Sequence, residues 1–163
     1  MSNDQYILAI GADNAGADLK NLVRQALAGD ARVTEVIDFG VMDASDSTAY
    51  PDIGFEVAKT VADGRARRGL LICGTGIGMA ITANKVPGIR STVAHDSYSV
   101  ERSVLSNNCQ ILTLGARVIG PELAIRLVKE WLGYEFDEAS ASAEKVARIT
   151  AFERSEGSSA VTA

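Results

Sequence analysis

Short apolar runs alternate with longer amphipathic stretches along this chain, and the alternation repeats five times. The apolar runs, which are typical of strands, are YILAIGAD, VTEVIDFG, GLLICG, IRSTVAHD and CQILTLG. Each is followed by a segment whose apolar residues recur at helical spacing. Parallel strands need crossover connections, and crossover helices cover both faces of the sheet. The chain is therefore predicted to form an α/β fold with a five-stranded parallel sheet.

A further segment with helical spacing, about residues 141–154, follows the last predicted strand. It predicts an extra C-terminal helix whose apolar face covers the body of the molecule or reaches a second subunit. We expect residues 1–154 to form a single domain, because a chain of 163 residues suits one hydrophobic core. Residues 155–163, SEGSSAVTA, are expected to form a disordered tail.

The charge and the cysteine count limit the class of protein. With 16 basic and 21 acidic residues the formal charge is −5, which disfavours binding to nucleic acid. No apolar run is long enough for a membrane span, and the opening MSNDQY lacks the layout of a signal peptide, so we expect a cytoplasmic protein. Cys73 and Cys109 are too few for a disulfide framework or a structural zinc site, and both are expected to be free thiols.

Conspicuous polar residues follow several of the predicted strands, at the point where each strand ends. They are Asp13, Asn14, Cys73, His95 and Arg117. Ligands of open α/β sheets bind outside the carboxyl ends of the strands. These residues are therefore expected to lie at one edge of the sheet, where a ligand binds.

The stretch CGTGIG, residues 73–78, joins the third predicted strand to the next helix. Such a loop aims main-chain N–H groups at one point, which attracts anionic oxygen. A nucleoside-triphosphate loop is excluded, because no Gly-Lys-Ser/Thr follows the second glycine. The dinucleotide fingerprint fits less well, because its third glycine position holds Met79. The third interpretation, an oxyanion site beside a reactive thiol, is favoured, and a dinucleotide site stays open as the weaker alternative.

Cys73 has two possible roles at the start of this loop. A thiol beside a helix N-terminus ionises more readily, because the dipole and the N–H groups favour thiolate, so Cys73 could act as a base. The alternative is a small buried hydrophobic residue that ends a strand. Cys109 has no comparable loop and is expected to be structural.

Two other features are expected to have no catalytic role. The basic stretch GRARRG, residues 64–69, ends a predicted helix, where arginines complement the helix dipole and remain solvated. Trp131 lies at helical spacing with Leu127 and Val128, which predicts packing in the core or at an interface.

Four stretches, CGTGIG, ANKVPGIR, HDSYSVERS and GARVIG, resemble in this order the ribose-5-phosphate isomerase B and galactose-6-phosphate isomerase family of aldose–ketose sugar-phosphate isomerases. The resemblance runs from IGADNAG to ITAFE and covers nearly the whole chain. It implies a Rossmann-like three-layer α/β/α sandwich and an enzyme that needs neither a metal nor an organic cofactor. It also implies a homodimer, or a tetramer of such dimers, with each site built from two subunits.

The resemblance implies roles for individual residues. Cys73 is the proton-transferring base, and residues Gly74 to Gly78 hold the developing enediolate. Asp13 is a candidate for moving the proton between O1 and O2, and Thr75 is a candidate for hydrogen-bonding the sugar or for moving hydroxyl protons. Arg117 binds the phosphate, and Asn107 is donated across the dimer. The residues expected to bind the substrate are Asn14, Tyr50, Gly74, Gly76, Ile77, Gly78, His95, Ser106, Asn107, Arg117 and Lys145.

The chain departs from the ribose-5-phosphate isomerases at two positions where those enzymes have histidine: it has Asn14 at one and Ser106 at the other. In addition, Lys145 occupies a position where family members often have a phosphate-binding arginine. The family histidine at position 106 helps to open a cyclic pentose, a step that needs proton transfer. A tetrose 4-phosphate cannot close such a ring, because the required oxygen carries the phosphate. The stretch LSNNCQILTLGARVIG also resembles the D-erythrulose 4-phosphate isomerase branch. The predicted reaction therefore interconverts D-erythrulose 4-phosphate and D-erythrose 4-phosphate, in tetritol breakdown.

Two alternative functions stay open. A ribose-5-phosphate isomerase gains support if His95 replaces the missing ring opener. Otherwise His95 and Asp96 only cap the helix that starts near Ser97. The second alternative is a protein that binds a sugar phosphate without converting it.

Overall fold

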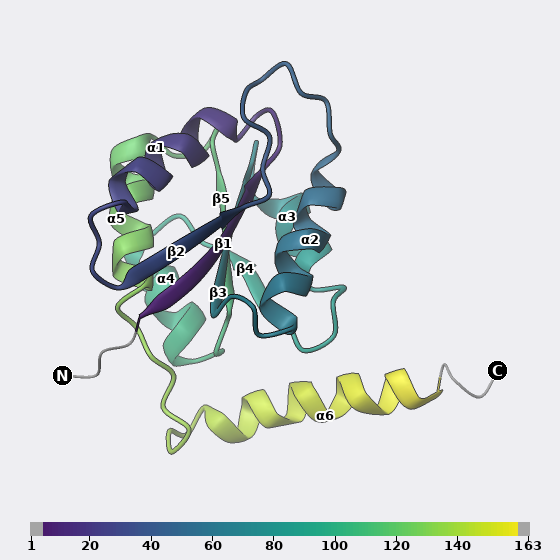
Figure 1. The fold of residues 1–163 in the computed structure, drawn as a ribbon. Coiled ribbons are helices and arrows are strands. Elements are labelled where there is room, and N and C mark those ends of the chain that lie inside the picture. The colour runs from purple at the N-terminus through teal and green to yellow at the C-terminus, as the bar shows by residue number, and fades with distance from the viewer. Residues whose placement is uncertain (1–4, 160–163) are drawn as a thin grey trace.

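A five-stranded parallel sheet lies between two layers of helices in the computed structural model, which describes residues 5–159 (Figure 1). The strands are β1 (Tyr6–Ala12), β2 (Val33–Asp38), β3 (Arg68–Cys73), β4 (Ser91–Val93) and β5 (Ile111–Gly115). The helices are α1 (Ala17–Leu27), α2 (Tyr50–Ala62), α3 (Ile77–Ala83), α4 (Ser97–Leu105), α5 (Pro121–Trp131) and α6 (Ala143–Ser159). The predicted Rossmann-like three-layer fold with an extra C-terminal helix is confirmed.

The strands are ordered β2-β1-β3-β5-β4, and all four pairings are parallel. Helices α2 and α3 pack together on one face, while α5 packs between α1 and α4 on the other (Figure 1). Because every strand points the same way, all the loops that follow strands lie at one edge of the sheet. We call it the carboxyl edge, and the opposite edge the amino edge.

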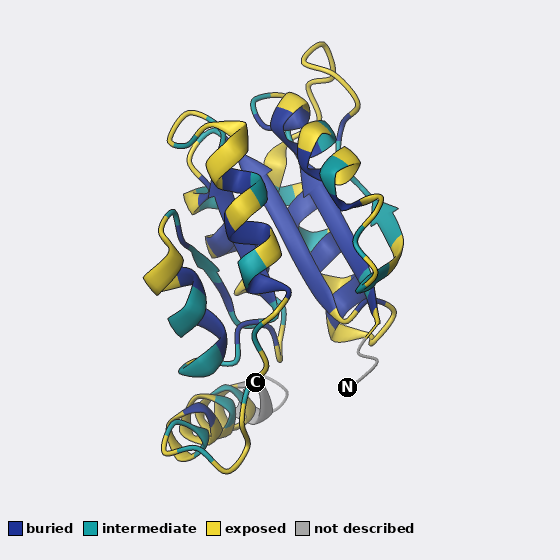
Figure 2. Ribbon diagram, turned by 90° about the vertical axis from the view of Figure 1, so that its left-hand side faces the viewer, coloured by how far each residue is buried: buried dark blue, intermediate teal, exposed yellow. Residues whose placement is uncertain are grey.

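The two faces of the sheet carry separate hydrophobic clusters, and Figure 2 shows the buried residues concentrated in the central strands. Along β3, Leu70 and Ile72 belong to the cluster on the side of α1 and α5, whereas Leu71 and Cys73 belong to the cluster beneath α2 and α3. This alternation follows from the two-residue period of a strand. Trp131 is fully buried in the first cluster, as predicted.

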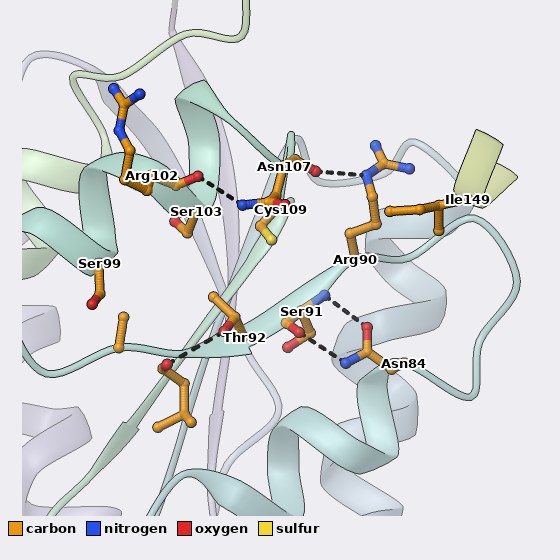
Figure 3. A pocket seen from close by; sticks show the side chains of 12 residues that line it. Asn84, Arg90, Ser91, Thr92, Ser99, Arg102, Ser103, Asn107, Cys109 and Ile149 are labelled. Atoms are coloured by element: carbon orange, nitrogen blue, oxygen red, sulfur yellow. Dashed lines mark hydrogen bonds between the residues drawn. The ribbon is translucent and has the colours of Figure 1, made fainter. Parts of the chain in front are cut away.

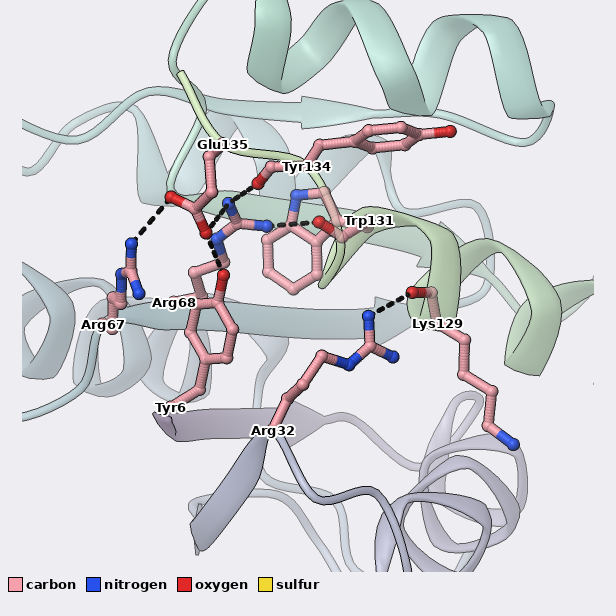
Figure 4. Close-up of polar contacts among 8 residues, drawn as sticks. All are labelled: Tyr6, Arg32, Arg67, Arg68, Lys129, Trp131, Tyr134 and Glu135. Atoms are coloured by element: carbon pink, nitrogen blue, oxygen red, sulfur yellow. Dashed lines mark hydrogen bonds and ion pairs between the residues drawn. The ribbon is translucent and has the colours of Figure 1, made fainter. Parts of the chain in front are cut away.

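The stretch GRARRG differs from its prediction at one position. Arg65 and Arg67 are exposed, but Arg68 is only 5% exposed. Its guanidinium donates hydrogen bonds to the main-chain oxygens of Trp131 and Tyr134 (Figure 4). The prediction was wrong for Arg68 because this residue begins β3, so its side chain reaches carbonyl groups at the end of α5 that take the place of water.

Aromatic and acidic side chains complete this arrangement at the amino edge (Figure 4). The Arg68 guanidinium lies 5.0 Å from the centroid of the Trp131 ring and 5.2 Å from that of Tyr6. Its Nη2 atom lies 3.6 Å from a Glu135 oxygen, and the Tyr6 hydroxyl donates to the same carboxylate. We call Tyr6, Arg68, Trp131, Tyr134 and Glu135 the Arg68 cluster. It ties β1 and β3 to the segment that leads from α5 to α6.

Helix α6 lies beyond the amino edge, apart from both helical layers (Figure 1, Figure 2). Val146 is buried, and the main-chain N–H of Gly88 donates to Glu153 over 2.8 Å. The helix continues to Ser159, beyond the expected end at Arg154 and into the segment expected to be a tail; residues 160–163 of that segment lie outside the described residues. None of the helices within residues 5–159 is long and apolar enough to cross a membrane.

Candidate active site

Cys73 is the last residue of β3, and its sulfur lies at the mouth of the glycine loop. The main-chain N–H of Gly76 donates to the Cys73 Sγ atom over 3.1 Å. The side of the sheet on which Cys73 lies is covered by α2 and α3, and the residue is 6% exposed. The structure thus joins the Cys73 thiol to the glycine loop by a directed hydrogen bond.

The glycine loop rests directly on the end of β5. Gly76 has a φ of +80°, which glycine adopts far more readily than other residues. Its carbonyl oxygen accepts a hydrogen bond from the Thr113 hydroxyl over 2.9 Å. A Cβ atom on Gly115 would lie 2.7 Å from the Cα and carbonyl carbon of Thr75. Both glycines are therefore required by close approach or by backbone conformation.

Thr113 was not singled out from the sequence. Its hydroxyl is fully buried and faces the loop from the middle of β5. The available signal was a hydroxyl residue within the otherwise apolar strand ILTLG. Because a buried polar group needs a partner, such a residue indicates that a main-chain group approaches the strand.

The residues on either side of Gly76 are more exposed than Gly76 itself. Thr75 and Ile77 are exposed, and the Thr75 hydroxyl accepts a hydrogen bond from the Ile77 N–H over 3.3 Å. Ile77 is the first residue of α3. The Thr75 hydroxyl therefore lies at the surface of the loop, where a ligand could reach it.

Tyr50 and Arg117 approach the loop from two different elements. Tyr50 starts α2, and a Cβ atom on Gly78 would lie 2.8 Å from two carbons of its ring. The Arg117 N–H donates to the carbonyl of Gly74 over 3.0 Å, and its Nη1 atom would lie 3.4 Å from a Cβ on Gly74. The structure thus places an aromatic ring and a cationic group beside the main-chain donors of the loop. A cation there favours an anionic ligand.

Asp13 and Asn14 lie at the same edge, between β1 and α1. An oxygen of Asp13 accepts hydrogen bonds from the main-chain N–H groups of Ala15 and Gly16, each over 3.1 Å. A Cβ on Gly16 would lie 2.5 Å from the carbonyl oxygen of Ile72, so this turn is packed against the residue before Cys73. Asn14 is exposed. The Asp13 carboxylate is therefore held in one orientation near the end of β3.

His95 and Asp96 follow β4 at this edge and make different contacts. Asp96 accepts a hydrogen bond from the Ser99 N–H over 2.7 Å and caps α4. The His95 Nε2 atom accepts one from the Gly115 N–H over 2.8 Å. Burial lowers the pKa of His95, although the nearby Asp96 acts in the opposite direction. Capping is therefore the role of Asp96, while His95 binds the end of β5.

Three residues expected in the site lie elsewhere in the single chain. Ser106 caps the C-terminal end of α4, which returns the chain to the amino edge, and Asn107 follows it. The Asn107 side chain donates to the carbonyl of Arg102 over 3.0 Å. Lys145 is exposed on α6, beyond the same edge. One chain therefore does not bring Ser106, Asn107 or Lys145 to the Cys73 loop.

Asn107 lines a separate hollow of about 540 Å³ along the free edge of β4 (Figure 3). Arg90 forms part of its wall and donates to the Asn107 carbonyl over 3.1 Å. Ile149 of α6 contributes an apolar side chain to the same hollow.

Within residues 5–159, no group of three or more His, Cys, Asp or Glu side chains is arranged so that it could hold a metal ion.

Comparisons with known proteins show which family the chain resembles. The sequence profile described as Ribose/Galactose Isomerase matches residues 8–149. The chain is 58% identical over 146 residues to D-erythrulose-4-phosphate isomerase 2 of Mycolicibacterium smegmatis, which covers 90% of this chain and 96% of that relative. It is 46% identical over 149 residues to D-erythrulose-4-phosphate isomerase of Pectobacterium atrosepticum, with coverage of 91% and 96%.

A solved structure shows the same fold. Ribose-5-phosphate isomerase B of Clostridium thermocellum superposes with a TM-score of 0.85 at 42% sequence identity, and the match covers 91% of this chain and 98% of that one. The family expected from the motifs is thereby confirmed: the chain belongs to the ribose/galactose isomerase family.

Proposed function

We propose that this protein interconverts D-erythrulose 4-phosphate and D-erythrose 4-phosphate, as an aldose–ketose isomerase of tetritol breakdown. The observation that carries the proposal is the contact of the Cys73 sulfur with the glycine loop, in a chain 58% identical to a protein named D-erythrulose-4-phosphate isomerase 2. Ser106 supports the four-carbon substrate, because serine is a poor general acid for opening a sugar ring and a tetrose 4-phosphate has none to open.

The reaction is a 1,2-proton shift through a cis-enediolate. Cys73, as thiolate, removes a proton from C1 of the ketose. The electrons of that C–H bond form the C1–C2 double bond, and the C2 carbonyl oxygen becomes negatively charged. The same sulfur then returns the proton to C2, which leaves the aldehyde at C1. No oxidant or cofactor enters this balance.

The other residues at the carboxyl edge stabilise the intermediate and move its hydroxyl protons. Main-chain N–H groups between Gly74 and Gly78 stabilise the developing oxyanion. Asp13 transfers the proton between O1 and O2, and Thr75 presents its hydroxyl to the sugar. Arg117 and Asn14 bind the phosphate.

The site is completed by a second copy of the chain. Ser106, Asn107 and Lys145 lie at the amino edge of their own chain, so they reach a Cys73 loop only in a partner subunit. Exposed apolar side chains on α3 and α6 supply surface for such a contact. They are Ile77, Ile81, Ile149 and Phe152. The homodimer, which could pair further into a tetramer, is therefore part of the proposal.

We propose that this isomerase is cytoplasmic. The two cysteines of the described chain are both free, and the mechanism requires Cys73 as a thiolate. A reducing compartment keeps such a thiol available.

Initial rates on D-erythrulose 4-phosphate and D-ribulose 5-phosphate test the proposal. We expect kcat/KM to be greater for the four-carbon substrate by about tenfold or more. A preference for the pentose would overturn the substrate and favour the ribose-5-phosphate isomerase reaction, which the similarity to the C. thermocellum enzyme keeps as the second candidate. Binding of both sugars without turnover of either would favour a sugar-phosphate-binding protein.

A further inference from the structure

The ring of His95 accepts a hydrogen bond at the end of β5, the strand that lies between β3 and β4. Ladder pairing between β4 and β5 stops at Val93 and Thr113, two positions before Gly115. After Val93 the chain turns away to begin α4. Gly115 is buried, and its N–H donates to the Nε2 atom of His95 over 2.8 Å. The imidazole therefore accepts a hydrogen bond from the buried Gly115 N–H, which lies beyond the end of the β4 pairing.

Gly115, which donates this hydrogen bond, is in contact with the glycine loop, residues 73–78. Gly115 is the register partner of Cys73, and the N–H of the next residue, Ala116, donates to the Cys73 carbonyl over 2.9 Å. The space beside the Gly115 Cα atom is filled by the backbone of Thr75, where an added Cβ would approach within 2.7 Å. A displacement of Gly115 would therefore displace both Cys73 and Thr75.

We propose that His95 is a positioning residue for the Cys73–Gly78 loop and acts through Gly115, a role that rests on the isomerase reaction proposed above. A main-chain N–H can only donate, so Nε2 is the acceptor and the neutral ring carries its proton on Nδ1. A ring-opening acid that acted through Nε2 would need a proton on that atom. The hydrogen bond to Gly115 occupies that nitrogen.

Two substitutions separate positioning from ring opening. His95→Leu removes the acceptor, while His95→Gln keeps an oxygen acceptor on a side chain of similar reach. Loss of alignment of oxyanion donors lowers rates strongly, so we expect kcat of His95→Leu to fall about 10- to 100-fold with KM nearly unchanged. The factor is expected to be equal for the four-carbon and the five-carbon substrate, and His95→Gln should recover most of it.

Two kinetic outcomes would overturn the inference. A selective loss on cyclic D-ribose 5-phosphate, with the acyclic D-erythrulose 4-phosphate unaffected, would make His95 a ring-opening acid. Equal activity of His95→Leu and the unsubstituted protein would remove His95 from the reaction altogether.

Nitrogen-15 NMR of the unsubstituted protein tests the hydrogen bond without any measurement of turnover. We expect Nδ1 to be protonated, Nε2 to be unprotonated, and the Gly115 amide resonance to shift in His95→Leu. A protonated Nε2 in the neutral ring would overturn the inference. Because this readout does not depend on the substrate, a protein that lacked isomerase activity would be distinguished from one in which His95 has another role.

Discussion

The sulfur of Cys73 accepts a hydrogen bond from the main-chain N–H of Gly76, over 3.1 Å. Gly76 can present this N–H because its φ of +80° turns the chain sharply between β3 and α3. The proposed base and the proposed oxyanion donors therefore belong to one turn of the chain. Changes to either partner are expected to alter the chemical step more than substrate binding.

Replacing Cys73 by Ala should lower kcat by about 10²- to 10⁴-fold, since this is the usual contribution of a positioned general base. Exchange of the C1 hydrogen of D-erythrulose 4-phosphate with solvent deuterium, followed by proton NMR, measures the abstraction step directly. Cys109→Ser is the matched control, because burial raises the pKa of the Cys109 thiol to about 11 and keeps it protonated. Exchange at the normal rate in Cys73→Ala would exclude the thiol as the base.

Gly115→Ala should damage the site through the backbone of Thr75. The added Cβ would lie 2.7 Å from that backbone, so the loop must move, and overpacking of this kind costs about 1–3 kcal/mol of stability. We expect a lower urea midpoint and a kcat reduced about tenfold or more. Gly29→Ala serves as the control, because no atom lies within 4 Å of its added Cβ. Normal activity of Gly115→Ala would show that the loop does not rest on β5 as described.

Arg117→Met should weaken phosphate binding. Hydrogen bonds to charged groups contribute about 1.5–3 kcal/mol, which corresponds to a rise in KM of about 10- to 100-fold. Arg117→Lys keeps the charge but loses the planar guanidinium. Its KM should therefore lie between that of the unsubstituted protein and that of Arg117→Met. Steady-state kinetics give both constants. A fall in kcat at unchanged KM would instead place Arg117 in the chemical step.

Sites shared between two subunits should allow complementation. Cys73→Ala and Asn107→Ala are each expected to be inactive as homodimers. After co-refolding, a hybrid dimer has one intact site, and random pairing restores about a quarter of full activity. Light scattering establishes the oligomer, and the activity of the mixture is the readout. A mixture that stays inactive although hybrid dimers form would exclude sharing of Asn107.

The stability of the protein should depend on pH through His95. Burial holds the pKa of His95 below its usual value of 6.5, so the unfolded chain binds more protons when the pH falls below 6.5. The stabilisation is present above that pH and is lost as the pH falls through the lower, folded-state pKa. Urea unfolding at a series of pH values should show this decrease, and His95→Gln should lack it. An identical pH dependence in both proteins would contradict the assignment.

Most of the fold could be predicted because its signals are local. The five alternations of strand and helix, and the glycines around residues 74–78, are visible within short windows of sequence. The motif order then identified the family. The arrangement of the carboxyl edge followed, since parallel strands all end on the same side.

The remaining features depend on contacts between distant segments. The burial of Arg68 requires carbonyl groups of Trp131 and Tyr134, which no local pattern links to it. The hydrogen bond between His95 and Gly115 depends on how soon β4 ends beside β5. Sequence spacing predicts neither the Arg68 contacts nor the His95 contact, because each depends on how one element packs on another.

The Arg68 cluster has a further consequence for assembly. Its hydrogen bonds attach the segment before α6 to β1 and β3, so the helix leaves the body in a set direction. If α6 and the segment before it moved freely, they would lose much conformational entropy on binding to another subunit. Segments that are already oriented lose little entropy, so the buried charge of Arg68 would lower the entropic penalty of the dimerisation proposed above.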